Sequence, residues 1–178
     1  LERAAPGHPP VRVAIDMDAA YRPVRGISIG AARSPLRTSA DVTRLAVSLL
    51  RRSNIRLVGL MAYEGQIAGV GNAASGLKGA AVRAMQGASA ADIRTRRAEA
   101  VAALNTLVDL EFVNGGGTGS LESTARESAV TEVAAGSGLF GPGLFDGYRH
   151  FQPKHALFFG LNVVRRPGPS TVTVLGGG

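Results

Sequence analysis

The sequence contains no cysteine, only two lysines and no long run of apolar residues. Without cysteine, this stretch can form neither a disulfide framework nor a thiolate metal site, and such a composition fits a reducing compartment. No segment reaches the roughly 18 consecutive apolar residues that a membrane-spanning helix needs. No signal peptide is visible at the start of the sequence. We therefore expect a cytoplasmic location and no membrane partner.

Positive charge is in excess, and the net charge of +7 comes almost entirely from arginine. A basic balance can indicate nucleic-acid binding. Here the arginines are scattered, with small clusters such as Arg94-Arg96-Arg97, and the aromatic residues, 5% of the chain, do not interleave with them. We interpret the arginines as a solvated surface and expect no nucleic-acid partner.

Segments typical of strands and helices alternate over about the first 135 residues. We expect strands at 11–16, 55–61, 110–114 and 130–134, and helices at 39–52, 77–86, 90–107 and 121–127. Ser39 is the expected N-cap of the first helix. The alternation predicts a parallel sheet with crossover helices, and 178 residues are enough for one sizeable core. Two longer strands, 155–164 and 171–175, are expected on either side of a turn at 167–169.

The most informative stretch is Asn114-Gly115-Gly116-Gly117-Thr118-Gly119-Ser120, between an expected strand and an expected helix. Glycines let the backbone approach a ligand and adopt positive φ. The N–H groups at a helix start attract anions, and Thr118 and Ser120 add hydroxyl donors. These features predict a phosphate site. The same residues also fit a tight strand-to-helix turn with Ser120 as N-cap, so the stretch alone leaves both interpretations open.

Polar residues gather at four expected strand ends. They are Asp16, Asp18 and Arg22; Tyr63, Glu64 and Gln66; the loop 114–120; and Gly136 and Ser137. Because sites in parallel α/β proteins lie at the carboxyl ends of strands, we expect these residues to form one common site.

Two carboxylates after a strand allow another interpretation. Asp16 and Asp18 could hold Mg²⁺ in a magnesium-dependent phosphotransferase. The pattern of such an enzyme has Thr or Val after the second Asp and a Lys further on, whereas Ala19 and Ala20 follow here. The three histidines show no metal-ligand spacing with each other, so we assign no metal ligand in this chain.

Three motifs resemble the D-threonine aldolase and D-serine dehydratase-like family (amino acid deaminase/aldolase proteins), among the alanine-racemase-like, fold type III enzymes that use pyridoxal phosphate. They are the glycine loop 114–120, Ala62-Tyr63-Glu64-Gly65, and Val133-Ala134-Ala135-Gly136-Ser137. The resemblance implies an α/β fold: the second half of an alanine racemase-like (β/α)8 TIM barrel over residues 1–153, then the first strands of a C-terminal β domain over 154–178. It also implies a fragment of an enzyme that is a homodimer when intact.

The same resemblance implies a cofactor site. The residues that would hold the cofactor phosphate are Gly117, Thr118, Gly119, Gly136 and Ser137. Arg22 would face the pyridine nitrogen, where a permanently charged guanidinium keeps that nitrogen unprotonated. Tyr63 would line the cofactor. Gln66 departs from the family pattern, which has a histidine there, so no base is assigned at that position.

The resemblance also places the family's Schiff-base lysine on the first barrel strand, upstream of this chain. Lys78 and Lys154 do not end expected strands, so no catalytic residue is assigned. The His and Cys that bind a divalent metal in intact members would lie beyond Gly178. We expect part of a pyridoxal-phosphate-dependent lyase of D-amino acids that is inactive by itself. The alternative is a phosphate-ligand binding module without chemistry.

Overall fold

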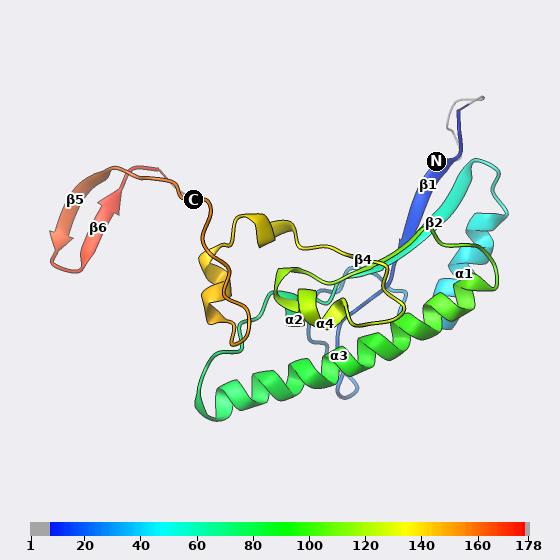
Figure 1. The fold of residues 1–178 in the computed structure, drawn as a ribbon, viewed down its shortest axis with the longest axis horizontal. Coiled ribbons are helices and arrows are strands. Elements are labelled where there is room, and N and C mark those ends of the chain that lie inside the picture. Colours follow the sequence, from blue (N-terminus) through cyan, green and yellow to red (C-terminus); the bar gives the residue numbers. More distant parts are fainter. Residues whose placement is uncertain (1–7, 177–178) are drawn as a thin grey trace.

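The computed structural model describes residues 8–176, and their fold is α/β. A four-stranded sheet has the order β1 (Val11–Asp16), β2 (Ile55–Ala62), β3 (Phe112–Gly115) and β4 (Glu132–Val133). Every neighbouring pair in it is parallel. The main helices are α1 (Ser39–Leu50) and α3 (Gly76–Asn105), and α3 runs along the length of the sheet (Figure 1). The predicted parallel α/β arrangement is therefore confirmed.

Shorter elements follow the carboxyl ends of the strands. They are α2 (Gly65–Ala68), η1 (Thr118–Ser120), α4 (Leu121–Thr124), η2 (Gly136–Leu139) and η3 (Gly143–Gly147). Each begins within a few residues of a strand end or of the previous short helix. The polar residues predicted to form a site therefore lie on these short elements and the loops between them.

The apolar core lies between the first two strands and the two main helices. Ile15 and Leu60 come from the strands, Val42 from α1, and Ile93 and Leu104 from α3, and each is almost completely buried. Burial of such side chains contributes roughly 1.5–3 kcal/mol each. This core holds β1, β2, α1 and α3 together and leaves the carboxyl ends of the strands free to carry polar groups.

Helix α3 differs from the expectation of two helices. Its buried positions include Gln86, Ser89, Ile93, Arg97 and Leu104, spaced three, four or seven residues apart on one face. Three of these five side chains are polar, so the buried face of α3 lacks the continuous apolar stripe by which a single helix is recognised in a sequence. The prediction that the arginine cluster 94–97 forms a solvated surface is wrong for Arg97, which is fully buried.

The C-terminal part forms a separate two-stranded antiparallel sheet of β5 (Val163–Gly168) and β6 (Thr171–Val174). This hairpin lies apart from the parallel sheet in Figure 1. The expected strand over 155–164 is wrong for most of its length, because residues 155–162 form no regular element. The register of the hairpin runs from Val163 opposite Val174 to Gly168 opposite Thr171, so β6 pairs with residues 163–168 and does not extend along the preceding segment.

Within residues 8–176, no helix is both long enough and apolar enough to cross a membrane.

The N-cap of α1 is Thr38 and not the expected Ser39. Thr38 Oγ1 accepts a hydrogen bond from Asp41 N at 3.2 Å, and Asp41 Oδ2 accepts one from Thr38 N at 3.0 Å. Thr38 Oγ1 also donates to Asp41 Oδ2 at 2.8 Å, and the bonds that Thr38 N and Oγ1 donate to this carboxylate hold the pKa of Asp41 below its usual value. Together they form a reciprocal capping box that satisfies donors at the start of the helix.

We expect Thr38→Ala to lower the free energy of unfolding by about 1 kcal/mol, because it removes the side-chain acceptor of the cap. Ser39→Ala is the matched control and should change stability by less than about 0.5 kcal/mol. Urea denaturation followed by circular dichroism measures both. Equal losses in the two variants would contradict the cap assignment.

Candidate functional site

The glycine loop after β3 turns two of its N–H groups inward. Gly116, at φ +78°, donates its N–H to Glu64 Oε2 at 3.2 Å, and Gly117 donates to Ser120 Oγ at 3.1 Å. A Cβ on Gly117 would lie 2.6 Å from Ala68 Cβ and 3.0 Å from the Tyr63 ring. Glycine is therefore required at both positions, at Gly116 by its backbone angle and at Gly117 by the close approach of neighbours.

The next two N–H groups of the loop have no protein acceptor. Across residues 8–176, no hydrogen bond uses the N–H of Thr118 or Gly119, nor that of Gly136 or Ser137 in the loop after β4. Thr118 Oγ1 lies 2.7 Å from Ser137 Oγ, so the two loops meet at these hydroxyls. Unpaired N–H groups and hydroxyls from these two loops are donors of the kind that bind phosphate.

Ser120 occupies the N-cap position of α4 but makes no side-chain cap bond. Its hydroxyl instead accepts from Gly117 N and donates to Glu64 Oε1 at 3.0 Å. The interpretation of the loop as a simple turn capped by Ser120 is therefore wrong about what the hydroxyl does.

A buried ion cluster lies beneath this loop, and sequence reasoning missed it. Arg97 of α3 donates to Glu64 Oε2 at 2.9 Å, to Ala62 O at 3.1 Å and to Glu127. The side chains of Arg97 and Glu64 are almost completely buried. Burial raises the pKa of Glu127, and the charge of Arg97 opposes that shift. The sequence offered one signal for this cluster: Arg97 is spaced four residues from Ile93 and seven from Leu104, which places it on the buried face of α3.

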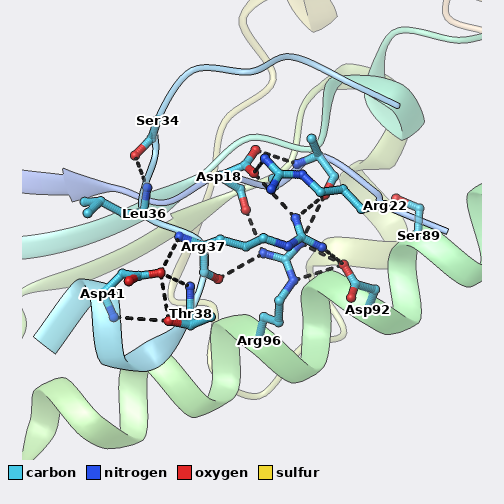
Figure 2. A network of polar contacts seen from close by, with 12 residues as sticks. Asp18, Arg22, Ser34, Leu36, Arg37, Thr38, Asp41, Ser89, Asp92 and Arg96 are labelled. Carbon is cyan, nitrogen blue, oxygen red and sulfur yellow. Dashed lines mark hydrogen bonds and ion pairs between the residues drawn. The ribbon is translucent and has the colours of Figure 1, made fainter. Parts of the chain in front are cut away.

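The two carboxylates at the end of β1, Asp16 and Asp18, form ion pairs with arginines. Figure 2 shows Asp18 facing Arg22, at 2.8 Å, and Arg37, at 3.4 Å. Asp18 is fully buried, and its other oxygen accepts from Ala20 N at 3.0 Å. Asp16 pairs with Arg33 at 3.1 Å. Residues 8–176 contain no group of three or more potential metal ligands, so nothing in this geometry supports a magnesium site at Asp16 and Asp18.

Arg96 completes this network from α3. Its guanidinium donates to Asp18 O at 2.7 Å and pairs with Asp92 at 2.7 Å. These contacts hold the loop after β1 in place (Figure 2). Arg22 keeps 45% of its side chain exposed, so Asp18 orients this guanidinium without burying it. Among the described residues, no hydrogen bond or ion pair joins Arg22 to the glycine loop.

Tyr63 and Gln66 follow β2 and have different surroundings. The Tyr63 ring lies beside Gly117 and Gly65, with the Arg33 guanidinium carbon 5.7 Å from its centroid. Gln66 is buried and donates to Ala19 O at 2.8 Å and to Ser89 Oγ at 2.7 Å. Gln66 therefore links α2 to α3 and to the loop after β1, and it has no role as a base.

A cavity of about 200 Å³ borders the glycine loop on the side of Tyr148, His150 and Phe151, which follow η3. Thr118, Gly119 and Tyr148 are among its lining residues. Tyr148 is buried and donates to Ile67 O at 3.0 Å, and its burial raises the pKa of the phenol to about 12. A Cβ on Gly119 would overlap the Tyr148 ring, which explains the glycine at this position.

Comparison with known proteins identifies a shared fold. No protein-family model matches the sequence, and no curated protein matches it. The structure is similar to the crystal structure of D-threonine aldolase from Filomicrobium marinum, with a TM-score of 0.71 and 22% sequence identity. The two proteins share a fold. The match covers 94% of this chain and 41% of that aldolase, so the chain spans less than half of the aldolase's length.

We expect Gly119→Ala to lower the free energy of unfolding by about 1–3 kcal/mol, because the added methyl displaces the buried Tyr148 ring. Gly136→Ala is the matched control from the second loop. A Cβ there meets nothing within 4 Å, so its effect should stay within about 0.5 kcal/mol. Chemical denaturation measures both variants, and a tolerated Gly119→Ala would contradict the packing described.

Proposed function

We propose that this chain is the cofactor-phosphate-binding part of a pyridoxal-phosphate-dependent lyase acting on D-amino acids, of the D-threonine aldolase or D-serine dehydratase type. In this proposal, the four parallel strands are half of a (β/α)8 barrel. The observation that carries it is the meeting of Thr118 and Ser137, at 2.7 Å, beside the unpaired N–H groups of their two loops. The fold shared with a D-threonine aldolase supports the same assignment.

The residues present fit the phosphate group of the cofactor. A phosphate ester accepts hydrogen bonds through several oxygens, and these loops offer four free N–H groups and a pair of hydroxyls, one of whose two hydrogens joins them to each other. Glu64, the nearest buried carboxylate, has both oxygens engaged by donors on its own side of the loop. We assign Gly117, Thr118, Gly119, Gly136 and Ser137 to the phosphate site, with Gly117 serving by its close approach to Tyr63.

Arg22 and Tyr63 would contact the ring of the cofactor. When bound, pyridoxal phosphate supplies an electron-accepting ring that weakens bonds to the α-carbon of an amino acid. Arg22 stays charged and is held by Asp18, so it would keep the ring nitrogen unprotonated and limit how strongly the ring withdraws electrons. The exposed part of the Arg22 side chain leaves its guanidinium accessible to such a ligand.

The positions of the lysines favour a second candidate, a binding module without chemistry. Lys78 lies in the first turn of α3 and Lys154 in an irregular segment, and both are exposed. Neither ends a strand, so neither lies at the sheet edge that carries the proposed phosphate site. Catalysis of the family's type would need a lysine from outside these 178 residues.

The phosphate site is tested by ligand binding. We expect the 178-residue chain to bind pyridoxal 5′-phosphate more tightly than pyridoxal, because only the former offers the phosphate. Thr118→Ala and Ser137→Ala should each weaken pyridoxal 5′-phosphate binding about ten-fold or more, since each removes a hydroxyl donor to a charged group. Isothermal titration calorimetry gives the dissociation constants.

The control variant is Ser170→Ala, in the turn between β5 and β6, which should bind like the wild type. Equal affinity for the two ligands, or no effect of either loop variant, would reject the phosphate site.

Covalent attachment tests whether this chain itself supplies a lysine that binds the cofactor. We expect borohydride treatment in the presence of pyridoxal 5′-phosphate to leave no stoichiometric adduct, because no lysine lies at the carboxyl edge of the sheet. Intact mass spectrometry measures the adduct, with Lys78→Arg and Lys154→Arg as controls for sporadic surface labelling. A stoichiometric adduct in the wild type that is lost in Lys78→Arg or in Lys154→Arg would show that the chain itself binds the cofactor covalently.

A further inference from the structure

We propose that Glu64 is the positioning residue of the glycine loop: its carboxylate binds the inner side of the loop, so that the N–H groups of Thr118 and Gly119 face outward for phosphate. This inference rests on the proposed function for the identity of the ligand. The arrangement of the loop itself rests only on contacts within the chain.

Four donors surround the Glu64 carboxylate. Oε1 accepts from Ser120 Oγ at 3.0 Å and from Thr124 Oγ1, and Oε2 accepts from Gly116 N at 3.2 Å and from Arg97 Nη2 at 2.9 Å. Three of these donors lie within residues 116–124, so the carboxylate joins the start of the loop to α4. A carboxylate can accept about four hydrogen bonds, and Glu64 uses this capacity on the loop and its counter-ion.

The division of the N–H groups follows from these bonds. Gly116 N is held directly by Glu64, and Gly117 N is held through Ser120 Oγ, which itself donates to Glu64. The chain then turns through η1, and the N–H groups of Thr118 and Gly119 are left without a protein acceptor. Because the N–H groups of Gly116 and Gly117 are fixed in this way, those of Thr118 and Gly119 are already in position before an anion binds. This lowers the entropy cost of ordering the loop on binding.

The Glu64 side chain acts only as an acceptor in this role, because all four of its partners donate. Arg97, fully buried, supplies the compensating charge and also pairs with Glu127. Glu127 contacts Arg97 but no donor of the glycine loop, so it is a matched control: removing either carboxylate leaves Arg97 with the other carboxylate and the carbonyl of Ala62.

The experiment compares Glu64→Ala with Glu127→Ala in the 178-residue chain. Hydrogen–deuterium exchange of the peptide 113–121 reports loop order, and calorimetric titration with inorganic phosphate reports the outward N–H groups. For Glu64→Ala we expect exchange roughly ten-fold faster or more in this peptide, with unchanged exchange in β1 and α1, and phosphate binding weakened about ten-fold. For Glu127→Ala we expect lower global stability, because a buried ion pair is broken, but a clearly smaller change in both quantities than in Glu64→Ala.

Wild-type exchange and affinity in Glu64→Ala, or the same losses in Glu127→Ala, would overturn the assignment. If Glu64→Ala does not fold, Ser120→Ala tests the same linkage, because it cuts the bond to Gly117 N and leaves both ion pairs of Arg97 in place. Unchanged exchange in Ser120→Ala would then overturn it. If the wild type binds neither inorganic phosphate nor pyridoxal 5′-phosphate, the proposed function fails, whereas the exchange comparison still decides whether Glu64 orders the loop.

Discussion

A guanidinium buried in a protein must be fully paired, because an unpaired charge in the interior costs several kcal/mol. Arg97 meets this requirement with Glu64 from the end of β2, Glu127 from beyond α4 and the carbonyl of Ala62. Two segments far apart in the sequence are thereby fixed to one helix. Helix α4 has four residues and could not be stable by itself, so its position depends on these polar contacts more than on apolar burial.

The long helix α3 carries two such anchoring points side by side. Arg96 holds the loop after β1 through Asp18 O, and Arg97 holds the loops after β2 and β3 through Glu64. Consecutive residues on a helix point about 100° apart, so neighbouring arginines can serve adjacent strand ends. The two halves of the candidate site, one at Arg22 and one at the glycine loop, therefore share a single rigid support.

The sequence predicted local features better than the polar contacts over long distances. The alternating Val11, Val13 and Ile15 predicted β1 with its observed bounds, and the strand-end rule located the glycine loop beside Ser137. The roles of Arg97 and Glu64 could not be predicted, because their partners lie 30 or more residues away and no local pattern encodes them. The prediction of two helices in place of α3 was wrong for the same reason. Gln86 and Ser89 are polar residues that are buried because they hydrogen-bond to distant residues, Val70 and Gln66.

The glycine loop shows why such a site needs support from below. Helix dipoles contribute to anion binding when a helix is long enough to align many peptide units, whereas η1 and α4 together span only residues 118–124. An anion at this loop would therefore depend on individual N–H groups and hydroxyls in fixed positions. A displacement of the backbone by a fraction of an ångström weakens each such bond, since hydrogen bonds tolerate little error in distance and angle. Anchoring the loop to a buried ion cluster limits that displacement, so the positions of the anion-binding donors depend on the ion cluster beneath them.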